Sequence, residues 1–105
     1  HTISMLMNTG HRPTAILVID DVIAISLIRE LVEAGFHIPR DVSIAGFNNI
    51  YMSEMSNPSI TTIDVGIYQL GYQTVQHLIR KLTGEKDLPT QVIVPHRLII
   101  RESTK

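Results

Sequence analysis

Two pairs of polar residues directly follow apolar runs of the sequence, and they are the residues best placed to bind a ligand or to catalyse a reaction. Asp20 and Asp21 end one apolar run, and Asn48 and Asn49 end another. Carboxylates and amides can hydrogen-bond the hydroxyl or amide groups of a small polar ligand. Two carboxylates could also serve acid–base chemistry, but side chains of adjacent residues rarely point into one site.

Other reactive chemistry finds little support in the sequence. The chain has no cysteine, so it can form neither a disulfide nor a thiolate nucleophile or metal ligand. No nucleophile elbow of the form Gly-x-Ser-x-Gly is present, and an acidic strand-to-helix turn would repel a phosphate. The histidines show no metal-ligand spacing; they are His1, His11, His37, His77 and His96. We therefore predict no catalytic residues, no metal site and no cofactor, and we do not expect an enzyme.

Length and charge limit the possible classes further. The 105 residues suffice for one domain at most, and a net charge of −1 gives no electrostatic footprint for nucleic acid or an anionic membrane. No apolar segment approaches the length of a membrane span. The sequence indicates a globular piece that does not itself bind DNA or a membrane, and the first residue, His1, suggests a piece of a longer protein.

The elements that carry the polar pairs form a βαβ unit. Residues 15–19 and 42–47 are continuous apolar runs, typical of parallel strands buried on both faces. Residues 22–34 between them have helical periodicity, and Asp21 is a suitable N-cap. Parallel strands end at the same edge of a sheet. Asp20 and Asn48 are therefore expected side by side, at the edge where ligands bind in open α/β sheets.

The consecutive asparagines allow two interpretations. Asn tolerates left-handed backbone and often makes turns without binding anything, and the stretch taken alone favours that interpretation for Asn48 and Asn49. Placed beside Asp20, Asn48 becomes the better candidate for a ligand contact, while Asn49 keeps the turn-making role.

The helix over residues 22–34 has two apolar faces. One stripe is suited to covering the sheet; it comprises Ala24, Leu27, Ile28, Leu31 and Gly35. Val22, Ile25 and Val32 form a second face beside it. That face is either buried against another part of the protein or a second subunit, or it consists of ordinary scattered surface hydrophobes.

The rest of the chain continues the α/β pattern. Methionines without clear periodicity predict a loop over residues 50–56. A short strand is expected over residues 60–65 and a long helix over residues 66–82. Two extended runs, residues 91–94 and 97–101, are split by Pro95, and residues 101–105 are expected to form a frayed polar tail. The predicted fold class is α/β, a three-layer doubly wound parallel sheet.

Five motifs together resemble the C-terminal part of LacI/GalR-type transcriptional repressors, in matching order and spacing over nearly the whole chain. They are RPTAILVIDD at 12–21, EAGFHIPRD at 33–41, VSIAGFNN at 42–49, PSITTI at 58–63 and HRLIIRES at 96–103.

The resemblance implies a type I periplasmic-binding-protein-like lobe with a crossover helix. Residues 1–63 and 91–105 would belong to the C-terminal lobe, and residues 64–90 would form a helix that packs on the N-terminal lobe. Such cytoplasmic repressors act as homodimers or larger assemblies. A small-molecule effector, sugar-like or related, modulates their binding to operator DNA through a headpiece that is absent from this chain.

The family pattern assigns further roles by position. Asp20 stands where the family usually has an Asn that contacts the effector, and Asn48 where it usually has an Asp, so the two side-chain types are exchanged. Val65 occupies a position where Gln is frequent, and an apolar side chain there removes a polar contact. The subunit contact would include Val22, Ile25, Met52, Met55 and Ser56.

Two other functions fit the same sequence. A fragment of a periplasmic sugar-binding protein of an uptake system would share the fold but lack DNA binding. The sequence upstream discriminates the two, because a helix-turn-helix supports the regulator and a signal peptide supports the transport protein. A small α/β enzyme that uses Asp20 and Asp21 is the third possibility, and it would require measurable turnover that Asp20→Asn abolishes.

Overall fold

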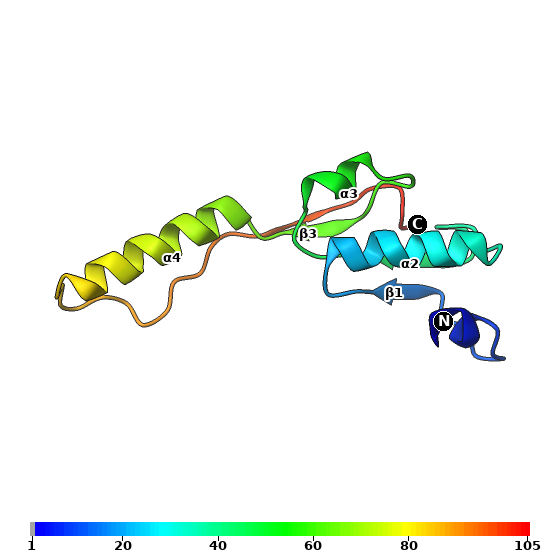
Figure 1. Ribbon diagram of the computed structural model, residues 1–105, viewed down its shortest axis with the longest axis horizontal. Helices are drawn as coiled ribbons and strands as arrows, with labels where there is room; N and C mark the ends of the chain where they lie inside the picture. Colours follow the sequence, from blue (N-terminus) through cyan, green and yellow to red (C-terminus); the bar gives the residue numbers. More distant parts are fainter. Residues whose placement is uncertain (1) are drawn as a thin grey trace.

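The computed structural model describes residues 2–105, so His1, where the predicted lobe begins, lies outside the described residues. The elements are α1 (Thr2–Met7), β1 (Ala15–Leu17), α2 (Asp21–Glu33), β2 (Ser43–Ala45), α3 (Tyr51–Met55), β3 (Thr62–Asp64), α4 (Ile67–Leu82) and β4 (Arg97–Ile99). The molecule measures 58 × 25 × 20 Å. Figure 1 shows why it is long: α1, α2, α3 and the strands gather into one lobe, from which α4 projects.

The sheet contains the predicted βαβ unit. β1 and β2 are parallel, with Ala15 opposite Ser43, and α2 connects them. A parallel bridge from Ala45 to Thr61 brings the start of the third strand beside β2. β4 then pairs antiparallel with β3, so Thr62 lies opposite Ile99. The α/β fold with parallel strands is confirmed, and the antiparallel pair marks where the chain leaves the lobe and returns.

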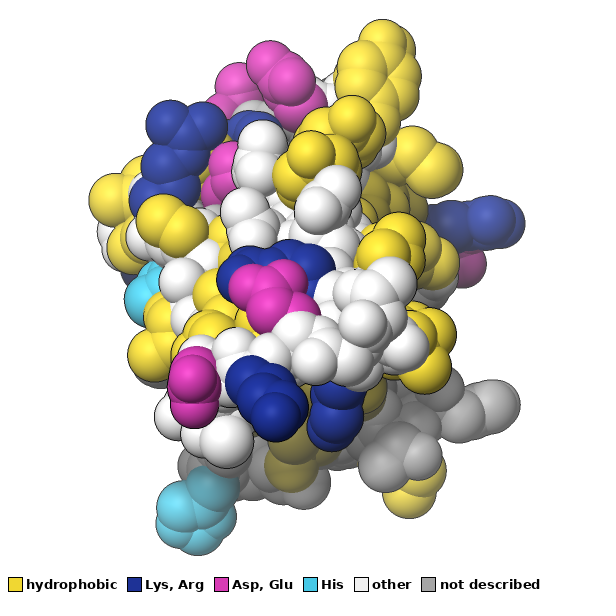
Figure 2. Space-filling view, turned by 90° about the vertical axis from the view of Figure 1, so that its left-hand side faces the viewer, with side chains coloured by type: hydrophobic (Ala, Val, Ile, Leu, Met, Phe, Trp, Pro, Cys, Tyr) yellow, Lys and Arg dark blue, Asp and Glu magenta, His cyan; other side chains and the backbone are white. Residues whose placement is uncertain are grey.

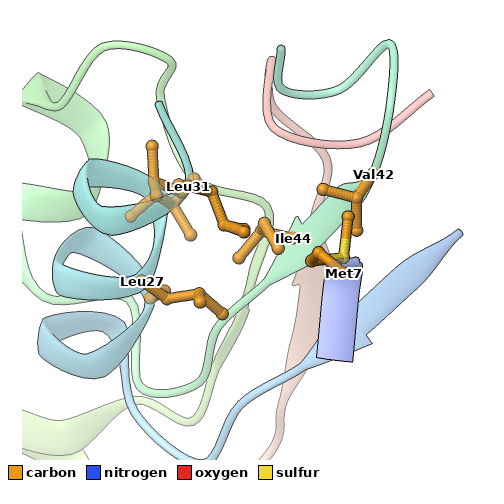
Figure 3. Packing of buried hydrophobic residues seen from close by; sticks show 8 residues of the cluster. Met7, Leu27, Leu31, Val42 and Ile44 are labelled. Atoms are coloured by element: carbon orange, nitrogen blue, oxygen red, sulfur yellow. The ribbon is translucent and has the colours of Figure 1, made fainter. Parts of the chain in front are cut away.

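The core of the lobe lies between α2, α1 and β2. Its buried hydrophobic residues are Met7, Ala24, Leu27, Ile28, Leu31, Val42, Ile44 and Ile60. Figure 3 shows the side chains of Leu27 and Leu31 converging on Ile44, with Met7 beside Val42. The helix stripe predicted from periodicity is therefore correct, except that Gly35 is exposed and has φ +91°, which suits the end of a helix.

Two local predictions are wrong. Residues 51–55 form the short helix α3 instead of a loop, and Ser56 ends it by donating its backbone N–H to the Met52 carbonyl at 3.0 Å. A helix of five residues is too short to show periodicity in a sequence.

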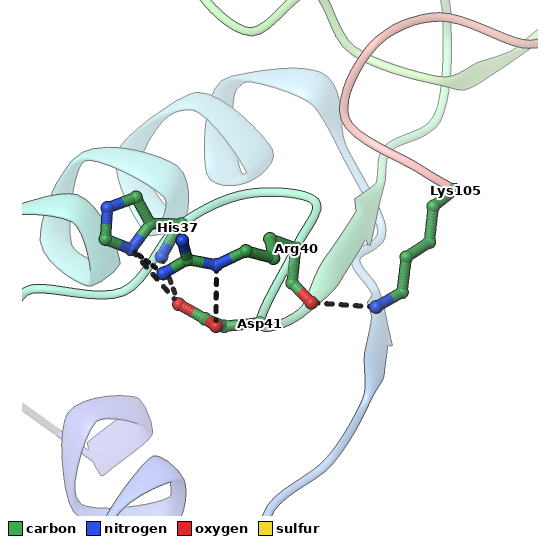
Figure 4. A network of polar contacts seen from close by, with 4 residues as sticks. All are labelled: His37, Arg40, Asp41 and Lys105. Atoms are coloured by element: carbon green, nitrogen blue, oxygen red, sulfur yellow. Dashed lines mark hydrogen bonds and ion pairs between the residues drawn. The ribbon is translucent and has the colours of Figure 1, made fainter.

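The expected frayed tail is also wrong, because the C-terminal residues pair with the sheet. Ser103 is fully buried; its carbonyl accepts from Ile44 N–H at 2.9 Å and its N–H donates to the Ser59 carbonyl at 2.9 Å. Beyond it, Lys105 Nζ donates to the Arg40 carbonyl at 2.7 Å (Figure 4). Backbone pairing on both sides holds an otherwise polar segment in place.

The loop before β2 is held by a carboxylate. Asp41 Oδ2 accepts from the His37 N–H at 2.7 Å, and Arg40 contacts both Asp41 and the His37 ring (Figure 4). The bond from the His37 backbone, followed by the bond and charge of Arg40, lowers the pKa of the Asp41 carboxyl below its ordinary value.

Helix α4 has the predicted extent but buries none of its residues. Gly66, with φ +60°, is its N-cap, and Arg80 and Lys81 occupy its last turn near the negative end of the helix dipole. Its apolar side chains are exposed, among them Leu70, Leu78 and Leu82. Figure 2 looks onto the projecting end and shows hydrophobic side chains interspersed with charged ones at the surface.

Candidate ligand site at the sheet edge

The two residues predicted to meet at the sheet edge are hydrogen-bonded. Asn48 Nδ2 donates to Asp20 Oδ2 at 3.0 Å, and both side chains are half-buried. The βαβ geometry brings them together across 28 positions of sequence. Their juxtaposition was predicted from the strand ends alone and is confirmed, whereas their role in binding stays a prediction.

Asp20, and not Asp21, caps helix α2. Asp20 has extended backbone with φ −156°, and its Oδ1 accepts from the Val22 N–H at 2.7 Å. The assignment of the cap to Asp21 is wrong by one residue, because Asp21 itself begins the helix. The Asp20 carboxylate thus has one oxygen on the helix N-terminus and the other on Asn48, which fixes its orientation at the edge.

Asp21 is instead a buried residue whose carboxylate accepts hydrogen bonds from other segments. Its side chain is fully buried; Oδ1 accepts from Thr62 Oγ1 at 2.7 Å and Oδ2 from Ile50 N–H at 2.9 Å. A Cβ at Gly46 would collide with the Asp21 carboxylate, so only glycine fits there. Asp21 therefore joins α2, β3 and the start of α3 directly beneath the edge, and it is withdrawn from any acid–base pair with Asp20.

Both asparagines make the turn that follows β2. Their φ angles are +97° for Asn48 and +52° for Asn49, the left-handed region that Asn tolerates better than most residues. The N–H of Asn48 donates to the Ile63 carbonyl at 2.9 Å. The division of roles between the two residues is thus partly wrong, because Asn48 combines turn-making with its bond to Asp20.

Val65, the third predicted ligand residue, lines an apolar hollow where the lobe meets α4. The other lining residues are Phe47, Ile63, Leu70, Val94 and His96. Phe47 immediately precedes Asn48 and thereby connects the hollow to the polar pair. The edge therefore offers one carboxylate and one amide next to an apolar wall, a combination suited to a small ligand with hydroxyl groups and an apolar face.

The junction between the lobe and α4 is held by Asp64. Its Oδ1 accepts from the Gly66 N–H at 2.9 Å, and Arg97 approaches its Oδ2 at 3.4 Å. The bond from Gly66 is the main reason that the pKa of the Asp64 carboxyl lies below its ordinary value, with smaller contributions from Arg97 and Asn49. The carboxylate is therefore ionised at neutral pH and holds the first turn of α4 next to β4.

The residues predicted for a subunit contact lie on two neighbouring helices. Val22, Met52 and Met55 are exposed, and Ile25 and Ser56 are partly buried. Ile25 and Ser56 line a shallow surface hollow between α2 and the end of α3, together with Val32 and Pro58. The described residues thus place all five at one region of the surface, and a covering subunit stays a prediction.

Arg101 is a residue of this region that sequence reasoning did not single out. Its guanidinium donates to Asn49 Oδ1 at 2.8 Å, to Ser53 Oγ at 3.0 Å and to the Ile60 carbonyl at 3.0 Å. The only signal in the sequence was its place in the closing motif at 96–103.

Within residues 2–105, no three His, Asp or Glu side chains are arranged to hold a metal ion. Among the same residues, no helix is both long and apolar enough to cross a membrane.

Comparison with known proteins decides the family. Residues 2–104 match the sequence model of the periplasmic binding protein-like domain. The chain belongs to that family. The NTD biosynthesis operon regulator NtdR of Bacillus subtilis is 38% identical over 94 residues, which are 89% of this chain and 29% of the regulator. The transcriptional repressor MelR of the same organism is 36% identical over 92% of this chain and 28% of its own length.

Solved structures of LacI-type regulators agree with this assignment. A LacI transcriptional regulator from Bacillus cereus subsp. cytotoxis superposes with a TM-score of 0.91 at 38% identity, over 98% of this chain and 36% of that one. The lac repressor dimer bound to operator and an anti-inducer superposes with a TM-score of 0.86 at 29% identity, over 98% of this chain and 36% of that one. A LacI family regulator from Enterococcus faecium with bound ribose superposes with a TM-score of 0.85 at 32% identity, over 97% of this chain and 37% of that one. The resemblance to LacI-type regulators is confirmed, and the chain spans under a third of the curated relatives.

Proposed function

We propose that this chain is the effector-sensing and dimerisation part of a LacI-type transcriptional regulator. The whole protein would bind operator DNA through a headpiece that is absent from this chain, and it would act in the cytoplasm. Relatives named as regulators support this proposal. No catalytic reaction is assigned to the chain.

The observation that carries the proposal is the Asp20–Asn48 pair, bonded at 3.0 Å where two parallel strands end. The Asn48 amide uses its nitrogen on Asp20, which leaves its carbonyl oxygen as an acceptor for a ligand hydroxyl or amine. The Asp20 carboxylate adds negative charge, and Val65 adds an apolar contact from the hollow that it lines with Phe47. We propose a small polar ligand, sugar-like or related, that donates hydrogen bonds to this pair.

The proposed domain division follows the shape of the molecule. Residues 1–63 and 91–105 would form the C-terminal lobe, and residues 64–90 would cross to an N-terminal lobe. The absence of any buried residue on α4 supports this division, because an amphipathic helix normally buries its apolar side. The ligand edge would then face the cleft between the lobes, beside the junction at Asp64.

In this arrangement an effector acts by linkage. A ligand that contacts both lobes favours the arrangement of lobes that it binds more tightly, and only this difference in affinity can change operator binding. The bound sugar in the Enterococcus faecium relative supports the ligand class proposed here.

A thermal-shift panel on the intact protein tests the ligand proposal, with sugars that include ribose, sugar phosphates, nucleosides and purines as probes. A specific ligand raises the melting temperature by mass action. Asn48→Ala should weaken the affinity for that ligand about tenfold or more, because it removes one or two hydrogen bonds. Gln91→Ala, an exposed amide outside the pair, is the matched control. Equal binding by Asn48→Ala and wild type would refute the proposed site.

We further propose that the surface around Ile25 is the subunit contact. Ile25→Glu should weaken dimerisation of the intact protein at least tenfold, because it places an unpaired charge in an apolar interface. Sedimentation equilibrium measures the dimer dissociation constant. Ile23→Glu makes the same substitution at an exposed position on a different side of α2 and controls for charge alone. An unchanged constant for Ile25→Glu would exclude this face.

A further inference from the structure

The Arg101 guanidinium lies at the meeting point of three segments. Nη2 donates to Asn49 Oδ1 at 2.8 Å, and Nη1 donates to Ser53 Oγ at 3.0 Å and to the Ile60 carbonyl at 3.0 Å. The backbone N–H of Arg101 is itself bonded to Thr61 Oγ1 at 2.9 Å. The side chain is therefore held from both ends, and it is half-buried.

Each partner of Arg101 belongs to a different part of the molecule. Asn49 adjoins Asn48 in the turn that carries the proposed ligand contact. Ser53 is fully buried in α3, between Met52 and Met55 of the proposed subunit contact. Arg101 itself follows β4, the strand by which the chain returns from α4 to the lobe. One side chain thus links the ligand turn, the contact helix and the strand from the interlobe junction.

A second polar path joins the turn to the start of α3, but it begins at the Asn49 backbone and not at its side chain. Thr62 Oγ1 accepts from Asn49 N–H and donates to Asp21, which accepts from Ile50 N–H. Asn49 N–H donates to Thr62 Oγ1 at 3.2 Å, which ties the turn to β3. Ser53 Oγ donates to the Ile50 carbonyl at 2.6 Å, which is local to α3. The side-chain bridge from Asn49 to α3 therefore passes through the guanidinium. Its planar, multiply donating geometry can hold several acceptors at fixed directions, which a lysine ammonium on a flexible stem cannot do.

We infer that Arg101 is a positioning residue that transmits displacement of the ligand turn to helix α3. This inference rests on the proposed function, which assigns a ligand contact to the turn and a subunit contact to α3. When the turn shifts, Asn49 moves the guanidinium, and the guanidinium moves Ser53 and the first turn of α3. The device needs no contact between Arg101 and the ligand.

Amide hydrogen exchange on the intact protein tests this inference without any ligand. In wild-type background, Asn49→Ala should raise exchange in both the turn and α3, residues 48–56. The increase should be about tenfold, the size expected for losing a hydrogen bond to a charged group. In Arg101→Lys background, Asn49→Ala should still loosen the turn but add nothing to the exchange of α3. Peptides of residues 24–31 in the core stripe of α2 serve as the internal reference.

Two further variants keep the test decisive. Arg97→Lys, on the same returning strand but exposed and bonded to Asp64, should leave α3 unchanged. If Arg101→Lys does not fold, Ser53→Ala removes the α3 end of the bridge together with the local bond to the Ile50 carbonyl. Measured against Ser53→Ala alone, Asn49→Ala should then add nothing to the exchange of α3. Additive effects in the double variants, or a uniform rise that includes α2, would overturn the inference. Because no effector is added, a failure to find the ligand leaves this result unaffected.

Discussion

Helices α2 and α4 share one sequence pattern and have opposite environments. Each repeats apolar residues at helical spacing, and each ends near a glycine with positive φ. The stripe of α2 is buried against β2 and α1, whereas α4 has no buried residue. Periodicity thus identifies the face of a helix that requires a partner, but it does not say whether the partner belongs to the same lobe.

The difference has consequences for stability. Each fully buried Leu or Ile on α2 contributes about 1.5–3 kcal/mol relative to its exposed state. Helix α4 has no such contribution in this chain and depends on local interactions. These include the ion pair of Arg80 with Glu85 across its C-terminal turn, at 2.5 Å, and isolated helices of this length are marginal in water. The lobe should therefore unfold cooperatively, while α4 follows its own equilibrium.

The largest expected effect compares one leucine from each helix. In the 105-residue chain, Leu31→Ala should lower the free energy of unfolding by about 2–5 kcal/mol, because it leaves a cavity in the core. Leu78→Ala should change it by less than about 0.5 kcal/mol, because the side chain is already exposed. Urea unfolding followed by circular dichroism measures both.

The same pair sharpens the comparison in the intact protein. If α4 is covered there by a second lobe, Leu78→Ala should approach the cost of a core substitution, while Leu31→Ala keeps its value. A cost for Leu78→Ala that stays near zero in both forms would mean that α4 is a genuinely exposed helix, and the proposed domain division would be wrong.

Patterns of several residues were predictable from the sequence. The apolar runs at 15–19 and 42–47 fixed two parallel strands, and the strand ends placed Asp20 beside Asn48, which the bond of 3.0 Å confirms. The buried stripe of α2 and the extent of α4 follow from a period of 3.6 residues sustained over several turns. These features depend on many residues acting together, so an error at one position does not change them.

Features decided by single residues were not predictable. Which of two adjacent aspartates caps α2 depends on backbone angles, and Asp21 becomes a connector only because Thr62 and Ile50 approach it in three dimensions. Likewise, the polar tail stays ordered because Ser103 bonds across 59 positions of sequence to the Ile44 carbonyl. Arg101 acquires its three partners in the same way. Such contacts carry no local periodic signal.

The smallest expected effect lies at the junction between the two regions, where Asp64 bonds the Gly66 N–H and faces Arg97. These contacts lower the pKa of the Asp64 carboxyl below its ordinary value of 3.8. A carboxyl with a lowered folded-state pKa adds stability above its unfolded pKa, and this contribution is lost as pH falls through the folded pKa. Carbon-detected NMR titration should therefore give an Asp64 midpoint below 3.8, and amide exchange at Gly66 should rise only below that midpoint.

Asp64→Asn supplies the control for this last prediction, because an amide does not titrate. In that variant, the amide exchange of Gly66 should no longer rise as pH falls below the carboxyl pKa. The amides of the buried stripe of α2 should exchange as in wild type. A step confined to Gly66 and the first turn of α4 would show that the lobe and α4 respond separately to pH. If protonation of Asp64 instead raised the exchange of α2 to the same extent, the lobe and α4 would form one cooperative unit. The two helices would then differ in solvent exposure but not in stability.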